Sequence, residues 1–151
     1  MEMKLFYKTG LMLFAFTVNV QAENNEFFND LVIRNINVTD FSAIIKISSI
    51  DRYQDINTDS GKTGYINYQF RAEVKKVLKG ELTQNIVFYD TAESGNEPQL
   101  NHKLRFVSLC VMDSKLFIPG NGYLITATDA LIESVRKNQS LEQHYNYNAC
   151  K

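Results

Sequence analysis

The chain has 151 residues and a formal net charge of −1, with 44% hydrophobic and 22% charged residues. This length suits one ordinary domain with a hydrophobic core of its own. The near-neutral charge argues against a dedicated nucleic-acid-binding protein, which normally carries a strong basic excess.

The N-terminus has the pattern of a secretory leader. A weakly positive start is followed at residues 10–20 by the apolar run GLMLFAFTVNV, which is too short to cross a bilayer as a mature helix. The tripeptide VQA, ending at Ala22, is typical of a signal-peptidase site. We therefore expect residues 1–22 to be a signal peptide and the mature protein to be secreted or periplasmic, free of the membrane. An uncleaved membrane anchor is the alternative.

The region after the leader, residues 23–151, contains no repeat, low-complexity tract or Pro/Gly-rich linker, which favours one domain. A short helix is expected at residues 27–32. The β-branched run AIIKISSI at residues 43–50 predicts a strand, and the polar residues 51–64 predict a loop after it.

The most regular pattern lies in FRAEVKKVLKGELTQNIVFYD, residues 70–90. Apolar and polar residues alternate from 66 to 75, which predicts a long half-buried strand. The alternation stops at Lys76 and the segment ends at Gly80, as expected of a bulge or bend before a turn. A return strand follows at residues 85–89. The alternation predicts which side chains face the interior: Phe70, Ala72, Val74, Ile86 and Phe88.

The same strand carries several basic side chains, but apolar residues interrupt them, so they do not form a continuous basic track for phosphates. We expect them to mark the water-facing side of the strand. They are Arg71, Lys75, Lys76 and Lys79.

Two more strands are expected at residues 105–111 and 123–127, the second after a Pro-Gly-Asn-Gly turn. Five strands of this length predict a small closed sheet. A helix is expected at residues 129–141, and the alternating tail QHYNYNAC predicts a final strand.

Cys110 and Cys150 are the two cysteines of the chain. Because the leader implies an oxidising compartment, they are expected to form one disulfide. A bridge that closes a loop of about 40 residues stabilises a fold by about 4 kcal/mol in the chain-entropy model. A reactive thiol is disfavoured because there is no Cys-x-x-Cys motif.

Four of these segments together carry a family resemblance. YQFRAEVKKVLKGE, NIVFYD, a cysteine before GNGYLITA and a terminal cysteine resemble the netrin-like module of the tissue inhibitors of metalloproteinases and their bacterial relatives. The similarity covers about residues 43–127 plus Cys150. It implies a mainly β protein with an OB-type five-stranded Greek-key barrel and one or two short flanking helices.

The chain departs from this family at its mature N-terminus. The inhibitors begin with Cys-x-Cys, whose amine and carbonyl chelate the zinc of the enzyme, whereas this chain would begin with Glu23, Asn24 and Asn25. The inhibitory mechanism of the family therefore has no residues here, and the resemblance implies a binding scaffold without naming a partner.

The tetrapeptide SGKT at residues 60–63 matches the end of a phosphate-binding loop. Such a loop needs a glycine at position 56, where Ile56 stands, and a helix after it, where a strand is expected. A phosphate-binding role is therefore rejected.

Asp55, Asn57 and Asp59 alternate as the ligands of a calcium loop do. The glycine and bidentate glutamate positions of that motif hold Ser60 and Ile66 instead. A solvated turn is the favoured interpretation, because Asp, Asn and Ser are also the residues that turns select. No metal ion or cofactor is expected.

His102 and His144, the two histidines, are too few for a zinc site without distant carboxylates, and both are expected on the surface. Tyr145 and Tyr147 suit either a recognition surface or an edge strand that packs on the barrel, and the second is favoured.

No set of catalytic residues is found. The sequence therefore predicts an exported, non-catalytic protein-binding module whose partner is another exported or cell-surface protein, and not a nucleic acid. The alternative function is a periplasmic inhibitor or immunity protein that blocks a toxin or hydrolase. An enzyme is a third hypothesis.

Overall fold

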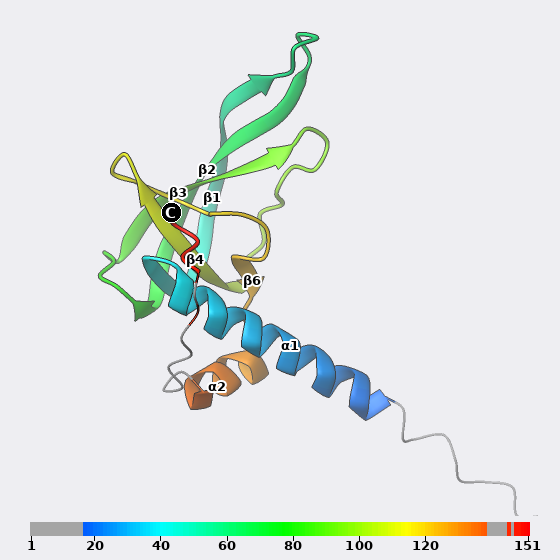
Figure 1. Ribbon diagram of the computed structural model, residues 1–151, viewed down its shortest axis with the longest axis vertical. Coiled ribbons are helices and arrows are strands. Elements are labelled where there is room, and N and C mark those ends of the chain that lie inside the picture. The colour runs from blue at the N-terminus through cyan, green and yellow to red at the C-terminus, as the bar shows by residue number, and fades with distance from the viewer. Residues whose placement is uncertain (1–16, 139–144, 146) are drawn as a thin grey trace, which may run out of the picture.

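The computed structural model describes residues 17–138, 145 and 147–151. The protein is mainly β, with a six-stranded sheet and two helices (Figure 1). The elements in chain order are α1 (Thr17–Val38), β1 (Phe41–Asn57), β2 (Thr63–Lys79), β3 (Asn85–Glu93), β4 (Leu104–Met112), β5 (Lys115–Phe117), β6 (Leu124–Thr126) and α2 (Asp129–Asn138). Neither helix, over the residues described, is long and apolar enough to cross a membrane.

Five strands form a closed ring in the order β1-β2-β3-β5-β4, because β4 also pairs with β1. The pairing of β3 with β5 is parallel, and the other pairings are antiparallel. The sixth strand, β6, also pairs with β4. It pairs with the first half of β4, whereas β5 pairs with the end of β4. The five strands expected from the sequence correspond to β1, β2, β3, β4 and β6, and the short strand β5 was not expected.

The core has two parts, which lie on opposite faces of β1 and β4. Ala43, Ile45 and Ile47 of β1 point into the ring, together with Phe70 and Phe88. The intervening Ile44, with Phe106 of β4, belongs instead to a second cluster against the two helices. This strand-wise alternation places the helices on the outside of the β1–β4–β6 wall.

The expected interior residues of β2 and β3 are confirmed. Phe70, Ala72, Ile86 and Phe88 are buried, and Val74 is partly buried against the same cluster. The register is the one the alternation requires, with Phe70 opposite Phe88 and Ala72 opposite Ile86.

The irregularity expected near Lys76 is also present. The pairing with β1 skips Lys75 and then Leu78, so β2 bends as it passes around the ring. Gly80 ends the bend with a φ of 73°, and a β-carbon there would lie 2.5 Å from the ring of Phe41. A larger residue would therefore be strained in conformation and would also clash.

Both helices are found, but α1 is much longer than the short helix expected at residues 27–32. Its sequence is rich in asparagine, a poor helix former, so local propensity alone does not predict the extra turns. Packing of Val32, Ile33 and Ile36 on the second cluster supports the helix instead. The second helix, α2, starts at the expected Asp129 and is described to Asn138.

The prediction of a loop at residues 51–64 is wrong. Strands β1 and β2 continue as a two-stranded hairpin that projects beyond the ring, and only a short turn joins them (Figure 1). We call residues 51–65 the arm. Almost all of its residues are exposed, so neither face shows the apolar alternation that reveals a strand in a sequence.

Cys110 and Cys150 form the expected disulfide, with 5.2 Å between their Cα atoms. The bridge and a hydrogen bond from the Ala149 amide to the Val38 carbonyl hold the C-terminal end against the ring. The described tail residues, 145 and 147–151, are not a strand, and residues 139–144 and 146 lie outside the described residues.

Candidate functional site

A cleft of about 340 Å³ lies between the arm, strand β3 and the turn that joins β4 to β5. Its floor and sides come from elements far apart in sequence, including Tyr53 of β1, Asn67 of β2, Tyr89 and Asp90 of β3, and Lys115 of β5. This is a size in which proteins commonly bind ligands, about 300–1,000 Å³.

Tyr53 is directed to the cleft by an irregularity in its strand. The β1–β2 register passes from Arg52 to Gln54, so Tyr53 is an extra, unpaired residue of the kind that forms a bulge. Its ring lies 5.2 Å from that of Tyr89, centroid to centroid, at a tilt of 59°. A bulge thus gives this side chain a direction that regular alternation would not.

Lys115 covers this pair of tyrosines. Its ammonium nitrogen lies 5.5 Å from the ring centre of Tyr53 and 5.4 Å from that of Tyr89. Both distances are within the range of a cation–π interaction. The same nitrogen is 3.5 Å from the Tyr53 hydroxyl. The three side chains therefore form a preorganised group, and Tyr53 is still 51% exposed.

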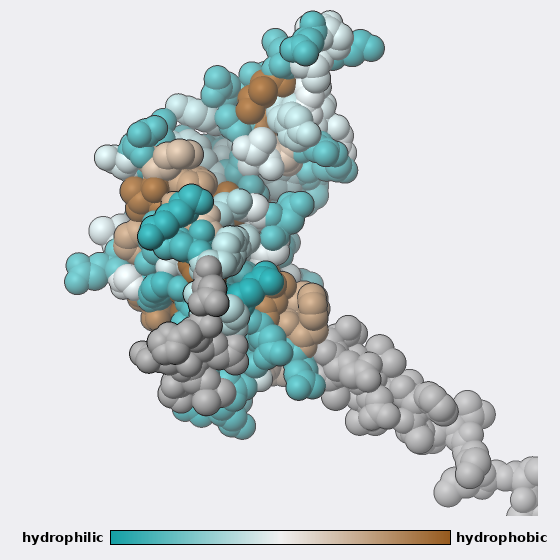
Figure 2. All heavy atoms as spheres, viewed as in Figure 1, coloured by the Kyte–Doolittle hydropathy of each residue, from teal (hydrophilic) through white to brown (hydrophobic). Residues whose placement is uncertain are grey.

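The turn between β4 and β5 brings Lys115 to this position. Asp113 and Ser114 both have positive φ, 50° and 63°, which is typical of the tight turn that joins antiparallel strands. The flanking Val111 and Met112 are 44% and 59% exposed. Hydrophobic surface is visible over this yellow hairpin of Figure 1 at the left of the space-filling view (Figure 2).

Asp90 is the half-buried acid of the cleft. Loss of hydration raises the pKa of its carboxyl to about 6, while the hydrogen bond from the Thr91 amide partly opposes the shift. No ion pair within the described part of the chain includes Asp90. A carboxyl in a cleft whose pKa is raised by desolvation makes the cleft a candidate for a functional site.

The lining residues indicate binding chemistry. The cleft has aromatic faces, a cation and an acid, but the described residues that line it include no serine, cysteine or histidine that could act as a nucleophile–base pair. The sequence analysis missed this site. Tyr53 and Lys115 are separated by 62 positions, and neither belongs to a recognisable motif.

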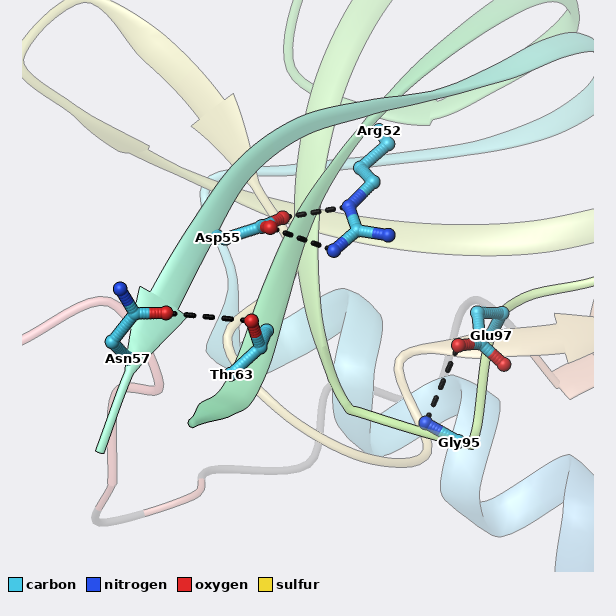
Figure 3. Close-up of polar contacts among 6 residues, drawn as sticks. All are labelled: Arg52, Asp55, Asn57, Thr63, Gly95 and Glu97. Carbon is cyan, nitrogen blue, oxygen red and sulfur yellow. Dashed lines mark hydrogen bonds and ion pairs between the residues drawn. The ribbon is translucent and has the colours of Figure 1, made fainter. Parts of the chain in front are cut away.

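The loop with calcium-like spacing is part of the arm, and its acidic side chain Asp55 is already engaged (Figure 3). Arg52 donates two hydrogen bonds to the Asp55 carboxylate, at 2.6 and 2.7 Å, which lowers the pKa of that carboxyl. Asn57 accepts a hydrogen bond from Thr63 across the hairpin. Figure 3 also shows Glu97, in the segment after β3, accepting from the Gly95 amide.

The SGKT segment forms the end of the hairpin turn and the start of β2, and a strand follows it as expected. Gly61 has a φ of 77° at the turn, a conformation that glycine adopts readily.

One group of metal-ligand residue types is found among the described residues, namely Asp40, Cys110 and Cys150. Its two sulfurs are bonded to each other in the disulfide, so they are not available as thiolate ligands. The Asp40 carboxylate accepts a hydrogen bond from the Val111 amide. This group is therefore explained by the disulfide.

The remaining candidates do not gather at the cleft. His102 is exposed before β4, and His144 lies outside the described residues. Tyr145 packs against the core of the ring, while the Tyr147 hydroxyl lies 3.1 Å from that of Tyr123. Packing on the ring is thus confirmed for Tyr145, whereas Tyr147 is 57% exposed, and the described residues there do not form the expected edge strand.

Comparison with protein-family models, curated proteins and solved structures finds no match to this chain.

Proposed function

We propose that this protein is an exported, non-catalytic binding module of the netrin-like type, and that it meets another exported or cell-surface protein at the cleft beside the arm. The observation that carries this proposal is the exposed, preorganised group of Tyr53, Tyr89 and Lys115. Tyrosine and methionine are enriched at protein interfaces, and aromatic anchors carry much of their binding energy.

The strand order supports the OB-type scaffold of this proposal, and the disulfide supports export. The ring has the order β1-β2-β3-β5-β4, closes on β1 and pairs β3 with β5 in parallel, an arrangement compatible with a five-stranded OB-type barrel. Export is supported by the disulfide, because such bridges persist in oxidising compartments.

The test measures binding to the captured partner by the wild type and by two matched variants. Tyr53→Ala removes a ring from the cleft, whereas Tyr65→Ala removes a ring of similar exposure, 47% against 51%, from elsewhere on the arm. We expect Tyr53→Ala to weaken binding by about tenfold or more and Tyr65→Ala to change it much less. Equal effects of the two variants would contradict docking at the cleft.

A second candidate function, inhibition of a toxin or hydrolase, is favoured by the projection of the arm (Figure 1). A narrow hairpin can enter the concave active site of an enzyme, and Ile56 near its tip is 40% exposed. Inhibition requires one tight partner with hydrolase activity that is lost on binding, and Ile56→Ala should restore that activity. Several weaker partners without lost activity would favour the general binding module. An activity screen of the protein itself addresses the remaining enzyme hypothesis.

A further inference from the structure

A second groove lies away from the arm and is lined by residues of α1, β6 and the start of α2. Figure 1 shows how these three elements are arranged. Its volume is about 470 Å³, within the range of about 300–1,000 Å³ typical of small-molecule sites. Among the described strands, β6 pairs with β4 alone, so none of them covers its other edge. The groove and the cleft beside the arm have no described lining residue in common.

The walls of this groove are mostly hydrocarbon. They include Phe28 and Leu31 of α1, Leu124 and Ile125 of β6, and Leu131 of α2. The Phe28 side chain is 40% exposed, so part of this apolar wall is open to solvent. Figure 2 shows brown hydrophobic atoms beside the place where α1 leaves the body of the protein. Such walls favour an aliphatic chain, because its burial removes apolar area from water.

Arg105 is the one charged residue that lines the groove within the described part of the chain. Its Nη1 donates a hydrogen bond of 2.9 Å to the Thr126 hydroxyl, while Nε is buried and has no partner. No ion pair among the described residues includes Arg105. A guanidinium without a counter-charge at an apolar surface is costly, and a carboxylate is the group that complements it.

We propose that this groove binds an aliphatic monocarboxylate, with the hydrocarbon chain between α1, β6 and α2 and the carboxylate facing Arg105. The bond to Thr126 restrains the guanidinium from one side, which lowers the entropic cost of receiving the ligand. The low dielectric of the hydrocarbon walls strengthens the charged contact. A short anion has no hydrocarbon chain to fill the groove, and an uncharged aliphatic molecule has no carboxylate to pair with Arg105. Both parts of the ligand are therefore required.

The first experiment measures the melting temperature of the full chain with three probes: decanoate, decanol and acetate. A ligand that binds the folded state raises this temperature according to its affinity and concentration. We expect decanoate to raise it clearly, decanol to raise it less, and acetate to leave it unchanged. Equal effects of decanoate and decanol would overturn the role of the carboxylate, and an equal effect of acetate would overturn the role of the chain.

The second experiment compares Arg105→Gln with Arg71→Gln, which removes an exposed arginine from the ring outside the groove. We expect decanoate to bind about tenfold more weakly to Arg105→Gln, the loss of one charge-assisted contact, and equally well to Arg71→Gln. If Arg105→Gln does not fold, Thr128→Asp places a negative charge at an exposed polar position of the groove, removes none of the apolar side chains that line it, and keeps a residue that can cap α2. That variant should weaken decanoate and leave decanol nearly unchanged, and equal weakening of both would contradict the proposal.

The third measurement maps the site and separates it from partner docking. Amide chemical shifts should change on decanoate addition at Leu124, Thr126 and Leu131. Changes confined to Tyr53 and Tyr89 would overturn the groove as the site. Loss of partner binding in Tyr53→Ala with decanoate binding intact would show that the two sites act independently.

Discussion

Phe70 is 1% exposed, and its ring lies almost parallel to that of Phe88, with 4.9 Å between the ring centres. Truncation to alanine removes this contact and leaves a cavity in the centre of the ring. We expect Phe70→Ala to lower the free energy of unfolding by about 3–5 kcal/mol, measured by urea denaturation, or to prevent folding.

The neighbouring Arg71 is the matched control. It is exposed, and the ion pair it makes with Asp51 is long, at 3.6 Å, between side chains that are each more than half exposed. Arg71→Ala should therefore change the free energy of unfolding by less than about 0.5 kcal/mol. A large loss in Arg71→Ala with little loss in Phe70→Ala would contradict the register of β2.

Asp90 makes stability depend on pH. Burial raises the pKa of its carboxyl from 3.8 to about 6, so the folded protein holds this proton more tightly than the unfolded chain does. The stability that results is complete below the unfolded pKa and is lost as the pH rises through the folded value. Asp90→Asn removes the charge, so this variant should gain stability relative to the wild type at about pH 8 and show little gain at about pH 4. Urea denaturation at both pH values checks this, and an equal gain at both would contradict it.

The hydrogen bonds of the Lys79 side chain could not be predicted from the residues around it in the sequence. It was expected on the water-facing side of its strand, with the other basic residues of that segment. Its ammonium group instead donates to the carbonyls of Asn37 and Thr39, at the C-terminal end of α1. A cation at this end of a helix satisfies free carbonyls and complements the helix dipole. The contact joins residues 40 or more positions apart, so local patterns do not contain it.

Among the elements, the C-terminal end depends most on one covalent bond. The disulfide closes a sequence separation of 40 residues between β4 and the tail. We expect the double variant Cys110→Ser and Cys150→Ser to lose about 4 kcal/mol in the free energy of unfolding. A reducing agent should lower the stability of the wild type and leave the double variant unchanged. Two free thiols in non-reducing mass spectrometry of the exported protein would contradict the bridge.

The sequence predicted the elements that have one buried face and one solvent-exposed face. It did not predict the arm or strand β5. Strand β2 within the ring alternates because one face packs on the core, whereas the arm is exposed and therefore has no apolar period. Strand β5 has three residues, too few for a pattern, and it follows a turn built from Asp113 and Ser114 without the usual glycine. The cleft needed both of these unpredicted elements, so its position could not be derived from sequence.

At the scale of the whole molecule, the leader remains a prediction that export experiments test. Helix α1 runs through the expected cleavage point between Ala22 and Glu23. Among the side chains described in α1, which begin at Glu26, the first buried one is that of Asn29, so these buried side chains all belong to the part of the chain expected to remain after cleavage. We expect the exported protein to have the mass of residues 23–151 and to remain folded. An exported protein of full-length mass held in the membrane would contradict cleavage and favour the anchor.

The sequence by itself determined that a mainly β domain forms, which residues of β2 and β3 are buried, and which cysteines pair. These properties follow from strand periodicity and from the presence of two cysteines, which the order of residues contains directly. Only the tertiary structure decided the closure of the ring through β1 and β4, the length of the arm, and the meeting of Tyr53 with Lys115 and of Arg105 with the apolar groove. These depend on bulges and on contacts between distant segments, whose free energies come from packing of the whole fold and leave no periodic trace in the sequence.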